Sequence, residues 1–324
     1  MVLKDTFTKT LCNSVVLCFS LCKKNVYFCH MQLLDGKVAS AAIKEDIKNK
    51  ILILEEQGKK TPHLAAILVG NDPASETYVA SKVKNCKEIG IKSSLFRYDS
   101  SISEEMLLDK INELNSDDDI DGILVQVPLP KHISEKKVTL KISPEKDVDG
   151  FHPLNIGNMV LGFPTFISAT PYGVLLMLQH YKISTQGKNV VVIGRSHTVG
   201  TPLSILMSRN NNEYGNATVT LCHSRTKDLK SICLQADIIV AAIGKPKFVT
   251  ADMVKENAVV IDVGINRVKD ETKKSGFALK GDVDFENVAP KCSYITPVPG
   301  GVGLMTIAAL LMNTYQAATL KINY

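Results

Sequence analysis

From Met31 onward, hydrophobic and polar positions alternate between a helical and a strand-like pattern. Isoleucine and leucine recur at helical spacing between Ile43 and Leu54, and Gly58 marks the predicted end of this helix. The segment 63–69, with the sequence HLAAILV, is a short apolar run typical of a buried strand. The regular part of the chain therefore opens with a helix and a strand.

The alternation continues through the first half of the chain. The next predicted elements are, in order, a helix from Pro73 to Ile89 with Asp72 as N-cap, a strand over 91–98, a helix opened by a capping box of Ser101 and Glu104, and a strand over 122–127. A strand–helix–strand–helix–strand order predicts parallel βαβ units. The acidic triplet at 117–119 is expected to be a solvated turn.

The same alternation restarts after a junction between Ser143 and Pro171 that is rich in glycine, proline and asparagine. Four β-rich runs follow, with helical patterns between the first three, at 190–193, 217–221, 238–243 and 259–263. A last helix is predicted to begin near Val302 and to pack back across the first half of the chain. The predicted fold class is therefore α/β, with two domains built on parallel sheets.

Composition supports a folded protein and argues against several classes. Of 324 residues, 45% are hydrophobic and 22% are charged, which supplies large cores and does not fit a disordered chain. The net charge of +5 suits an anionic small ligand and is too weak to indicate nucleic acid binding. Because no run of about 18 apolar residues occurs, we expect no membrane-spanning segment.

Half of the eight cysteines lie in the first thirty residues, at positions 12, 18, 22 and 29. No Cys-x-x-Cys pair occurs and the histidines form no ligand-spaced cluster, so we expect no metal site. A chain of this length needs no disulfide framework, and we expect reduced thiols and a cytoplasmic protein. Residues 1–30 are expected to be a disordered extension or an over-long start, with a targeting peptide as the alternative.

A buried strand runs into a glycine turn and then a helix at residues 190–202. Gly194, Arg195 and Ser196 form the turn. A doubly wound sheet places a pyrophosphate at such a turn, on the N–H groups of the following helix N-terminus. Because Ser196 replaces the second glycine of the usual Gly-x-Gly-x-x-Gly pattern, the motif alone is a weak sign of a dinucleotide.

The end of the next strand favours NADP over NAD. NAD-binding folds place an Asp or Glu there to hold the free 2′-hydroxyl of the ribose. This chain has the sequence CHSR at 222–225, and Arg195, Ser224 and Arg225 offer donors suited to a 2′-phosphate. The alternative is that these are ordinary surface residues of a loop.

A lysine, a tyrosine and a glutamine form a candidate catalytic group in the first half. Tyr78 and Lys82 are four residues apart and share one helix face, where a lysine that covers an aromatic core residue is the ordinary alternative. Gln126 is polar inside an apolar strand and needs partners, which a contact with Lys82 in a cleft would supply. A poorly solvated lysine can serve as a general acid or base.

The junction loop adds two carboxylates, Asp147 and Asp149. A single carboxylate there can accept two hydrogen bonds from the edge of an aminopyrimidine. His152 in the same loop is expected to be structural, because no partner marks it as a base.

Five motifs follow one another along the chain: S-x-x-Y-V-x-x-K at 75–82, DGILVQVPLP at 121–130, KDVDGFHP at 146–153, GRSHTVGTP at 194–202 and ITPVPGGVG at 295–303. In this order and spacing they resemble the bifunctional methylenetetrahydrofolate dehydrogenase/methenyltetrahydrofolate cyclohydrolase family, from about Met31 to the C-terminus. The resemblance implies oxidation of 5,10-methylenetetrahydrofolate by hydride transfer to NADP, then hydrolysis of the methenyl cation to 10-formyltetrahydrofolate, in one-carbon metabolism. It also implies a homodimer with folate in an interdomain cleft.

The resemblance further implies the domain limits and the role of each site residue. An N-terminal three-layer α/β domain would span 31–150 and be completed by the C-terminal helix 302–324, and a Rossmann-like NADP-binding domain would span 170–301. Lys82 matches the general acid/base of hydrolysis, and Gln126 holds it in place. Tyr78 matches the residue that positions folate, and Asp149 the residue that binds the pterin. The other matched positions are Val125, Val127, Pro299, Gly300, Gly301, Val302 and Gly303 for substrate, and Gly194, Arg195, Ser196, Ser224 and Ile265 for NADP.

Two alternative functions stay open on sequence alone. A dehydrogenase without cyclohydrolase activity would need neither Lys82 nor Gln126 as a proton shuttle. A non-catalytic nucleotide-binding protein on the same scaffold would be expected to lose the lysine or the loop glycines, which this chain keeps. Three features depart from the family pattern. Leu304 stands where proline is common, Ala169 stands where cysteine is common, and Asn211 to Gly215 resembles a short insertion ahead of the second strand of the cofactor-binding half.

Overall fold

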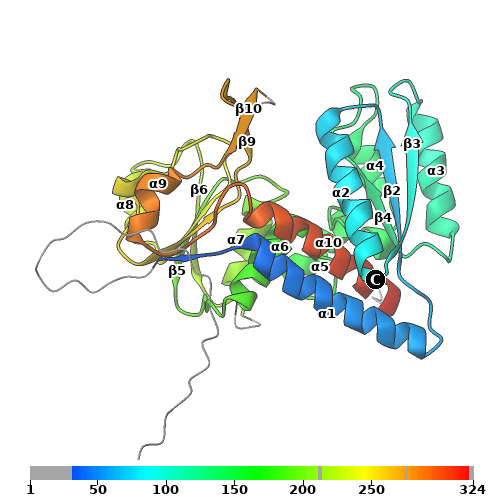
Figure 1. Ribbon diagram of the computed structural model, residues 1–324, viewed down its shortest axis with the longest axis horizontal. Coiled ribbons are helices and arrows are strands. Elements are labelled where there is room, and N and C mark those ends of the chain that lie inside the picture. The colour runs from blue at the N-terminus through cyan, green and yellow to red at the C-terminus, as the bar shows by residue number, and fades with distance from the viewer. Residues whose placement is uncertain (1–30, 211–213, 274–275, 321–324) are drawn as a thin grey trace, which may run out of the picture.

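Three long helices form a platform that carries two lobes (Figure 1). The structure, a computed structural model, describes residues 31–210, 214–273 and 276–320, so the predictions for residues 1–30 concern a segment outside these ranges. The platform helices are α1 (Gly36–Glu56), α6 (Ala169–His180) and α10 (Val302–Thr319). Helix α10 packs against α6 and α1 and also contacts the first lobe, which confirms that the last helix returns across the first half of the chain.

The first lobe is a three-stranded parallel sheet between two layers of helices. Its elements are β2 (His63–Val69), α2 (Pro73–Ile89), β3 (Lys92–Tyr98), α3 (Glu104–Ser116), β4 (Gly122–Val125), α4 (Glu135–Lys141) and the short η1 (Pro144–Lys146), with the strand order β3–β2–β4. The even-numbered residues of β2 pack with α1, α2 and α10. The odd-numbered residues pack with α3 and α4 on the other face. The predicted three-layer α/β arrangement is therefore confirmed.

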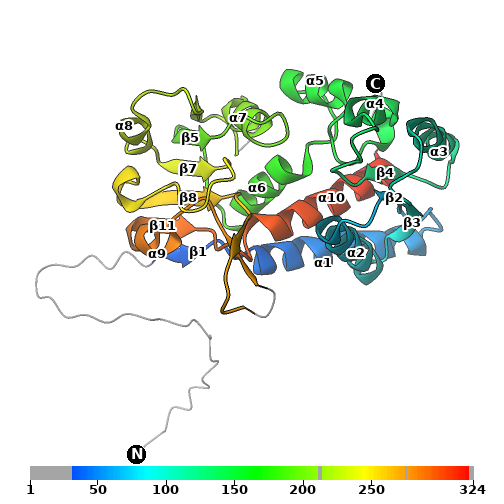
Figure 2. The ribbon, with the colours of Figure 1, turned by 90° about the horizontal axis from the view of Figure 1, so that it is seen from above.

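The second lobe is a six-stranded parallel sheet with the order β1–β11–β8–β7–β5–β6, most of which is visible in Figure 2. Its elements are β1 (Gln32–Leu33), α5 (Pro153–Leu161), β5 (Asn189–Ile193), α7 (Gly200–Ser208), β6 (Thr218–Cys222), α8 (Leu229–Cys233), β7 (Ile238–Ala241), η2 (Ala251–Met253), β8 (Ala258–Asp262), α9 (Phe285–Val288), η3 (Ala289–Lys291) and β11 (Cys292–Ile295). The chain reverses the direction of strand addition between β5 and β7. A doubly wound sheet binds its ligand outside the carboxyl ends of the strands at such a switch point.

A separate antiparallel hairpin projects from the second lobe (Figure 1). It consists of β9 (Asn266–Lys269) and β10 (Phe277–Lys280), which pair along their whole length. The hairpin follows β8 directly, so it stands beside the carboxyl end of the six-stranded sheet.

The predicted start of α3 was wrong by two residues. Ser103 caps this helix through its side chain, whereas Ser101 lies outside it. Glu104 does not close a capping box, because its carboxylate accepts a hydrogen bond from Ser134 N at 2.7 Å. A longer-range partner has replaced the local one that the motif predicted.

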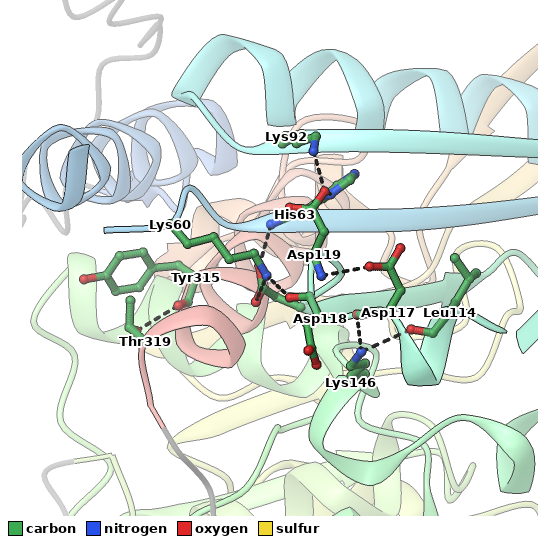
Figure 3. A network of polar contacts seen from close by, with 11 residues as sticks. Lys60, His63, Lys92, Leu114, Asp117, Asp118, Asp119, Lys146, Tyr315 and Thr319 are labelled. Carbon is green, nitrogen blue, oxygen red and sulfur yellow. Dashed lines mark hydrogen bonds and ion pairs between the residues drawn. The ribbon is translucent and has the colours of Figure 1, made fainter. Parts of the chain in front are cut away.

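The prediction that the acidic turn at 117–119 is simply solvated was wrong, because basic side chains bind it (Figure 3). Lys92 pairs with the Asp119 carboxylate, and His63 Nδ1 lies 2.9 Å from the same carboxylate. Lys146 Nζ donates to a backbone carbonyl of the turn at 2.7 Å. This network closes the amino end of the first lobe's sheet.

Candidate active site

A cavity of about 370 Å³ lies at the carboxyl end of the first lobe's sheet, against the platform. Its walls come from α2, the segment after β4, the junction loop, α6 and α10. The predicted site residues that line it are Tyr78, Lys82, Val125, Gln126, Val127 and Asp149. The structure thus brings together side chains from three motifs that are far apart in the sequence.

Lys82 and Gln126 face each other in this cavity. Lys82 is only 9% exposed, and its Nζ donates to Gln126 Oε1 at 3.2 Å. Strand β4 ends at Val125, so Gln126 lies just beyond the strand and not inside it as predicted, although its main-chain N–H still bonds to Ile67 O. Gln126 Nε2 donates to the Val127 carbonyl at 2.7 Å. This second bond turns the amide so that its oxygen faces the lysine.

The two carboxylates of the junction loop differ in their surroundings. Asp147 is buried and accepts hydrogen bonds from His152 N at 2.7 Å and Asn155 Nδ2 at 2.9 Å, so it organises the loop. Asp149 lines the cavity, and burial raises its pKa to about 6 against the opposing effect of Lys82. Asp149 is therefore the carboxylate placed to meet a ligand. His152 caps α5 through its ring, a structural role as predicted.

A second cavity of about 220 Å³ shares Tyr78 and Ile307 with the first. Ile265 and the predicted loop 299–303 line it, and the hairpin contributes to its wall. Leu304, which replaces the common proline, is 37% exposed and also lines this cavity. The loop and Ile265 therefore lie beside the larger cavity, with Tyr78 between the two spaces.

The glycine turn after β5 has the backbone that a pyrophosphate site requires. Gly194 has a φ of +119°, and a Cβ there would lie 2.0 Å from the Ala242 carbonyl oxygen, so a side chain is excluded. Ser196 Oγ accepts hydrogen bonds from Val199 N at 3.1 Å and Gly200 N at 3.4 Å. Its hydroxyl thus holds the turn against the start of α7, at the switch point of the sheet.

The predicted donors for a 2′-phosphate stand at the carboxyl ends of β5 and β6. Arg195, Ser224 and Arg225 are all exposed there. The three residues that follow β6 carry no carboxylate. This donor set fits the 2′-phosphate of NADP better than the free hydroxyl of NAD.

Two buried aspartates that the sequence did not single out fix the loops beside this turn. The Asp282 carboxylate accepts four hydrogen bonds of 2.7 to 2.9 Å, from the N–H groups of Ile243, Gly244 and Lys245 and from Asn266 Nδ2. Asp262 accepts three backbone N–H groups in the same way, and burial raises its pKa to about 6. No sequence signal marks this pair, because the partners of Asp282 lie up to 39 residues away.

Within the ranges that the structure covers, no group of three or more His, Cys, Asp and Glu side chains is placed to hold a metal ion. In the same ranges, no helix is both long and apolar enough to cross a membrane. Among the described cysteines, Cys86, Cys222 and Cys233 are buried free thiols. Cys292 is also buried, and its Sγ donates to the Val288 carbonyl at 3.3 Å.

A lysine, an amide and a carboxylate in one cavity beside a dinucleotide-binding lobe define a two-domain NAD(P)-dependent enzyme. Two family models match the chain, namely the tetrahydrofolate dehydrogenase/cyclohydrolase catalytic domain over residues 34–149 and the NAD(P)-binding domain of the same enzyme over residues 168–322. The chain belongs to the tetrahydrofolate dehydrogenase/cyclohydrolase family.

Individual relatives agree with the family models. The bifunctional protein FolD of Cytophaga hutchinsonii is 62% identical over 291 residues, which cover 90% of this chain and 100% of that protein. The structure of the bifunctional FolD enzyme from Campylobacter jejuni is 49% identical, with a TM-score of 0.83 and coverage of 89% and 98%. The Trypanosoma brucei dehydrogenase-cyclohydrolase, complexed with NADP and an inhibitor, is 33% identical, with a TM-score of 0.84 and coverage of 91% and 99%. The predicted enzyme with both activities and the predicted NADP cofactor are confirmed.

Proposed function

We propose that folate lies across the two cavities, with its pterin in the larger one, and that the residues matched by motif carry the two reactions. The observation that carries this assignment is the Lys82–Gln126 contact in the cavity that Asp149 also lines. In this assignment residues 31–150 and the helix from 302 form the folate-binding domain. Residues 170–301 form the NADP-binding domain.

Asp149 and Tyr78 bind the pterin from two sides. The carboxylate of Asp149 accepts the forked N–H donors of the aminopyrimidine edge, and the Tyr78 ring lies between the pterin space and the second cavity. The loop 299–303 and Leu304 then enclose the remainder of the substrate. Enclosure on these sides keeps water from the reacting carbon during hydride transfer.

The second lobe holds the cofactor. NADP, when bound, accepts a hydride from the methylene carbon of the substrate. Gly194 and the N-terminal N–H groups of α7 suit its pyrophosphate, and Arg195 and Ser224 suit its 2′-phosphate. We assign the support of the nicotinamide to Ile265, which lines the second cavity. The Ser196 hydroxyl acts indirectly, because it already binds the backbone of the turn.

Lys82 moves a proton in the hydrolytic step. Water adds to the methenyl carbon and gives one proton to the Lys82 amine. As the carbonyl of the formyl group forms, the bond from this carbon to one ring nitrogen breaks, that nitrogen receives one proton, and one proton is released. Gln126 accepts a hydrogen bond from the Lys82 amine and so keeps the amine directed at the reacting carbon.

We also infer a homodimer and a cytoplasmic location. The homodimer rests on the family resemblance, and sedimentation would find a mass near twice 35.4 kDa. The buried free thiols of Cys86, Cys222 and Cys233 support a reducing compartment. Mass spectrometry of the protein isolated from cells would show whether residues 1–30 are retained, and fractionation would test the compartment.

The wild-type protein tests the activity and the cofactor preference directly. It is supplied with methylenetetrahydrofolate and either NADP or NAD, and the absorbances of the reduced cofactor and of the methenyl product are followed. We expect both absorbances to change with NADP and much lower rates with NAD. A preference for NAD would contradict the role of Arg195 and Ser224.

Lys82→Met tests the proton shuttle. We expect the kcat of methenyltetrahydrofolate hydrolysis to fall by roughly 100- to 10,000-fold, the usual size of a general acid–base contribution, while folate still binds. Lys84→Met is the matched control, because Lys84 lies on the same helix with a 77% exposed side chain. Near-normal hydrolysis by Lys82→Met would show that the assignment is wrong.

A further inference from the structure

One buried amide on the platform joins the two chain segments that flank α5. Asn313 lies on α10 and is 0% exposed. Its Nδ2 donates to the Val148 carbonyl at 2.8 Å and to the Ile167 carbonyl at 2.9 Å. These carbonyls are 165 and 146 residues away in the sequence, so the contacts are a product of the folded arrangement.

The two flanking segments, residues 147–152 and 163–168, also touch each other directly. Gly150 has a φ of +70°, and a Cβ there would lie 2.6 Å from Ser168 N and 3.1 Å from the Ile167 carbonyl oxygen. Only a residue without a side chain allows this approach. Asn313 therefore holds together two segments that are already in close contact.

Each carbonyl bound by Asn313 belongs to the residue just before one that lies at, or contacts a segment beside, a predicted ligand site. Val148 precedes Asp149, the carboxylate of the larger cavity. Ile167 precedes Ser168, whose Oγ donates at 3.0 Å to the carbonyl of Thr198, which lies between the glycine turn and the start of α7. The Asn313 side chain thus joins the segment that carries Asp149 to the segment whose Ser168 is bonded to the loop after the glycine turn.

The chemistry of Asn313 shows that its donors are what matters. Both hydrogens of Nδ2 are directed at backbone carbonyls, one buried and one partly buried, that need a partner. Its Oδ1, by contrast, is buried and has no hydrogen-bond partner among the described residues, which is an energetic cost. An apolar residue of similar size would avoid that cost, so packing alone does not account for an asparagine here.

We propose that Asn313 is a positioning residue that sets the distance between the Asp149 carboxylate, which binds folate, and the glycine turn, which binds the cofactor. The inference rests on the proposed roles of Asp149 and of the glycine turn. Hydride transfer requires folate and NADP to be held at a fixed distance and orientation from each other. Hydrolysis instead uses Lys82 and Gln126, which lie on α2 and just after β4 and not on the flanking segments. Loss of the Asn313 amide should therefore lower the kcat of the dehydrogenase reaction more than the kcat of the cyclohydrolase reaction.

The test compares Asn313→Leu and Asn313→Ala with the wild type, well below their melting temperatures. We expect the KM for both folates to rise, the dehydrogenase kcat to fall by about 10- to 100-fold, and the cyclohydrolase kcat to change by less than about threefold. Thr314→Val is the matched control, because the buried Thr314 hydroxyl bonds only to Leu310 O of its own helix among the described residues. This control should keep the wild-type ratio of the two activities.

Gly150→Ala supplies an independent variant in case the Asn313 substitutions fold poorly. It keeps the amide but forces the flanking segments apart, and we expect the same selective loss of dehydrogenase kcat. If the variants lose only thermal stability and keep wild-type KM and kcat values, or lose both kcat values equally, the positioning role is overturned. If the wild-type enzyme itself lacks either activity, the proposed function fails instead.

Discussion

Both ends of the first lobe's sheet carry lysine and aspartate side chains, but these side chains are paired with one another at the amino end and largely unpaired at the carboxyl end. At the amino end, Lys92 and His63 both bind the Asp119 carboxylate (Figure 3). Lys60 Nζ lies 2.9 Å from Asp121 Oδ1. Charges of opposite sign therefore meet one another there. The network joins the starts of β2 and β3 to the turn before β4.

At the carboxyl end, the polar groups keep unused bonding capacity. Within the described residues, Lys82 Nζ makes a single hydrogen bond, to Gln126, and no hydrogen bond to the Asp149 carboxylate is found. Both groups line a cavity, and burial raises the pKa of Asp149 to about 6. Charged side chains that are paired with one another stabilise the structure, whereas charged side chains in a cavity that keep free hydrogen-bonding capacity are suited to bind a ligand. The difference indicates that function belongs to the carboxyl end.

Substitution of the unsaturated carboxylate should have the largest effect on substrate binding. For Asp149→Asn we expect the KM for methylenetetrahydrofolate to rise about 100-fold, since loss of a charged acceptor costs about 3 kcal/mol. Initial rates over a range of folate concentrations measure this change. Asp119→Asn makes the same chemical change at the amino end and should leave KM unaltered. Equal effects of the two substitutions on KM would contradict the assignment of substrate binding to the carboxyl end of the sheet.

The raised pKa of Asp149 adds a pH dependence with a defined sign. Only the ionised carboxylate accepts both substrate N–H groups, and the ionised fraction falls as the pH drops through about 6. The KM of the wild-type enzyme should therefore be nearly constant above about pH 7, be about doubled near pH 6, and rise by up to roughly tenfold per pH unit well below it. Asp149→Asn should show no such rise. A flat wild-type profile from neutral pH to pH 5 would contradict the assignment.

A smaller effect is expected at Gln126, which orients the lysine. Gln126→Leu removes the acceptor for Lys82 Nζ, and we expect the cyclohydrolase kcat to fall by about tenfold, less than the full general acid–base contribution. Dehydrogenase kcat should fall less, because hydride transfer needs no proton shuttle. Parallel assays of both activities on one preparation measure the ratio. An equal loss in both would indicate a structural role for the amide.

The sequence predicted those features whose signals are local. Helix α2 has its predicted limits because Asp72 and Pro73 define its start, and Tyr78 and Lys82 share a face by spacing alone. The glycine turn after β5 was likewise predicted, since a strand, a glycine and a helix occur in one short segment.

Features that depend on distant partners were missed. The two-residue strand β1 is too short to show a pattern, yet it pairs with β11 at the edge of the second lobe's sheet. Asp282 and Asn313 bind groups that lie far away in the sequence. Such residues look like any other buried polar residue until the chain is folded, because their function is set by what the topology places beside them.

The smallest effect is expected from Asp119→Asn, and it should be on stability alone. Hydrogen bonds from Lys92 and His63 lower the pKa of Asp119, so its contribution to stability is present at neutral pH and is lost as the pH falls below the ordinary value of 3.8. Because the side chain is exposed, solvent screens these pairs, and we expect the melting temperature to fall by only about 1–3 °C at pH 7. Added salt should shrink this difference further. Thermal unfolding at low and high salt measures it, and a change in either enzymatic activity would show that the amino end of the sheet communicates with the cavity after all.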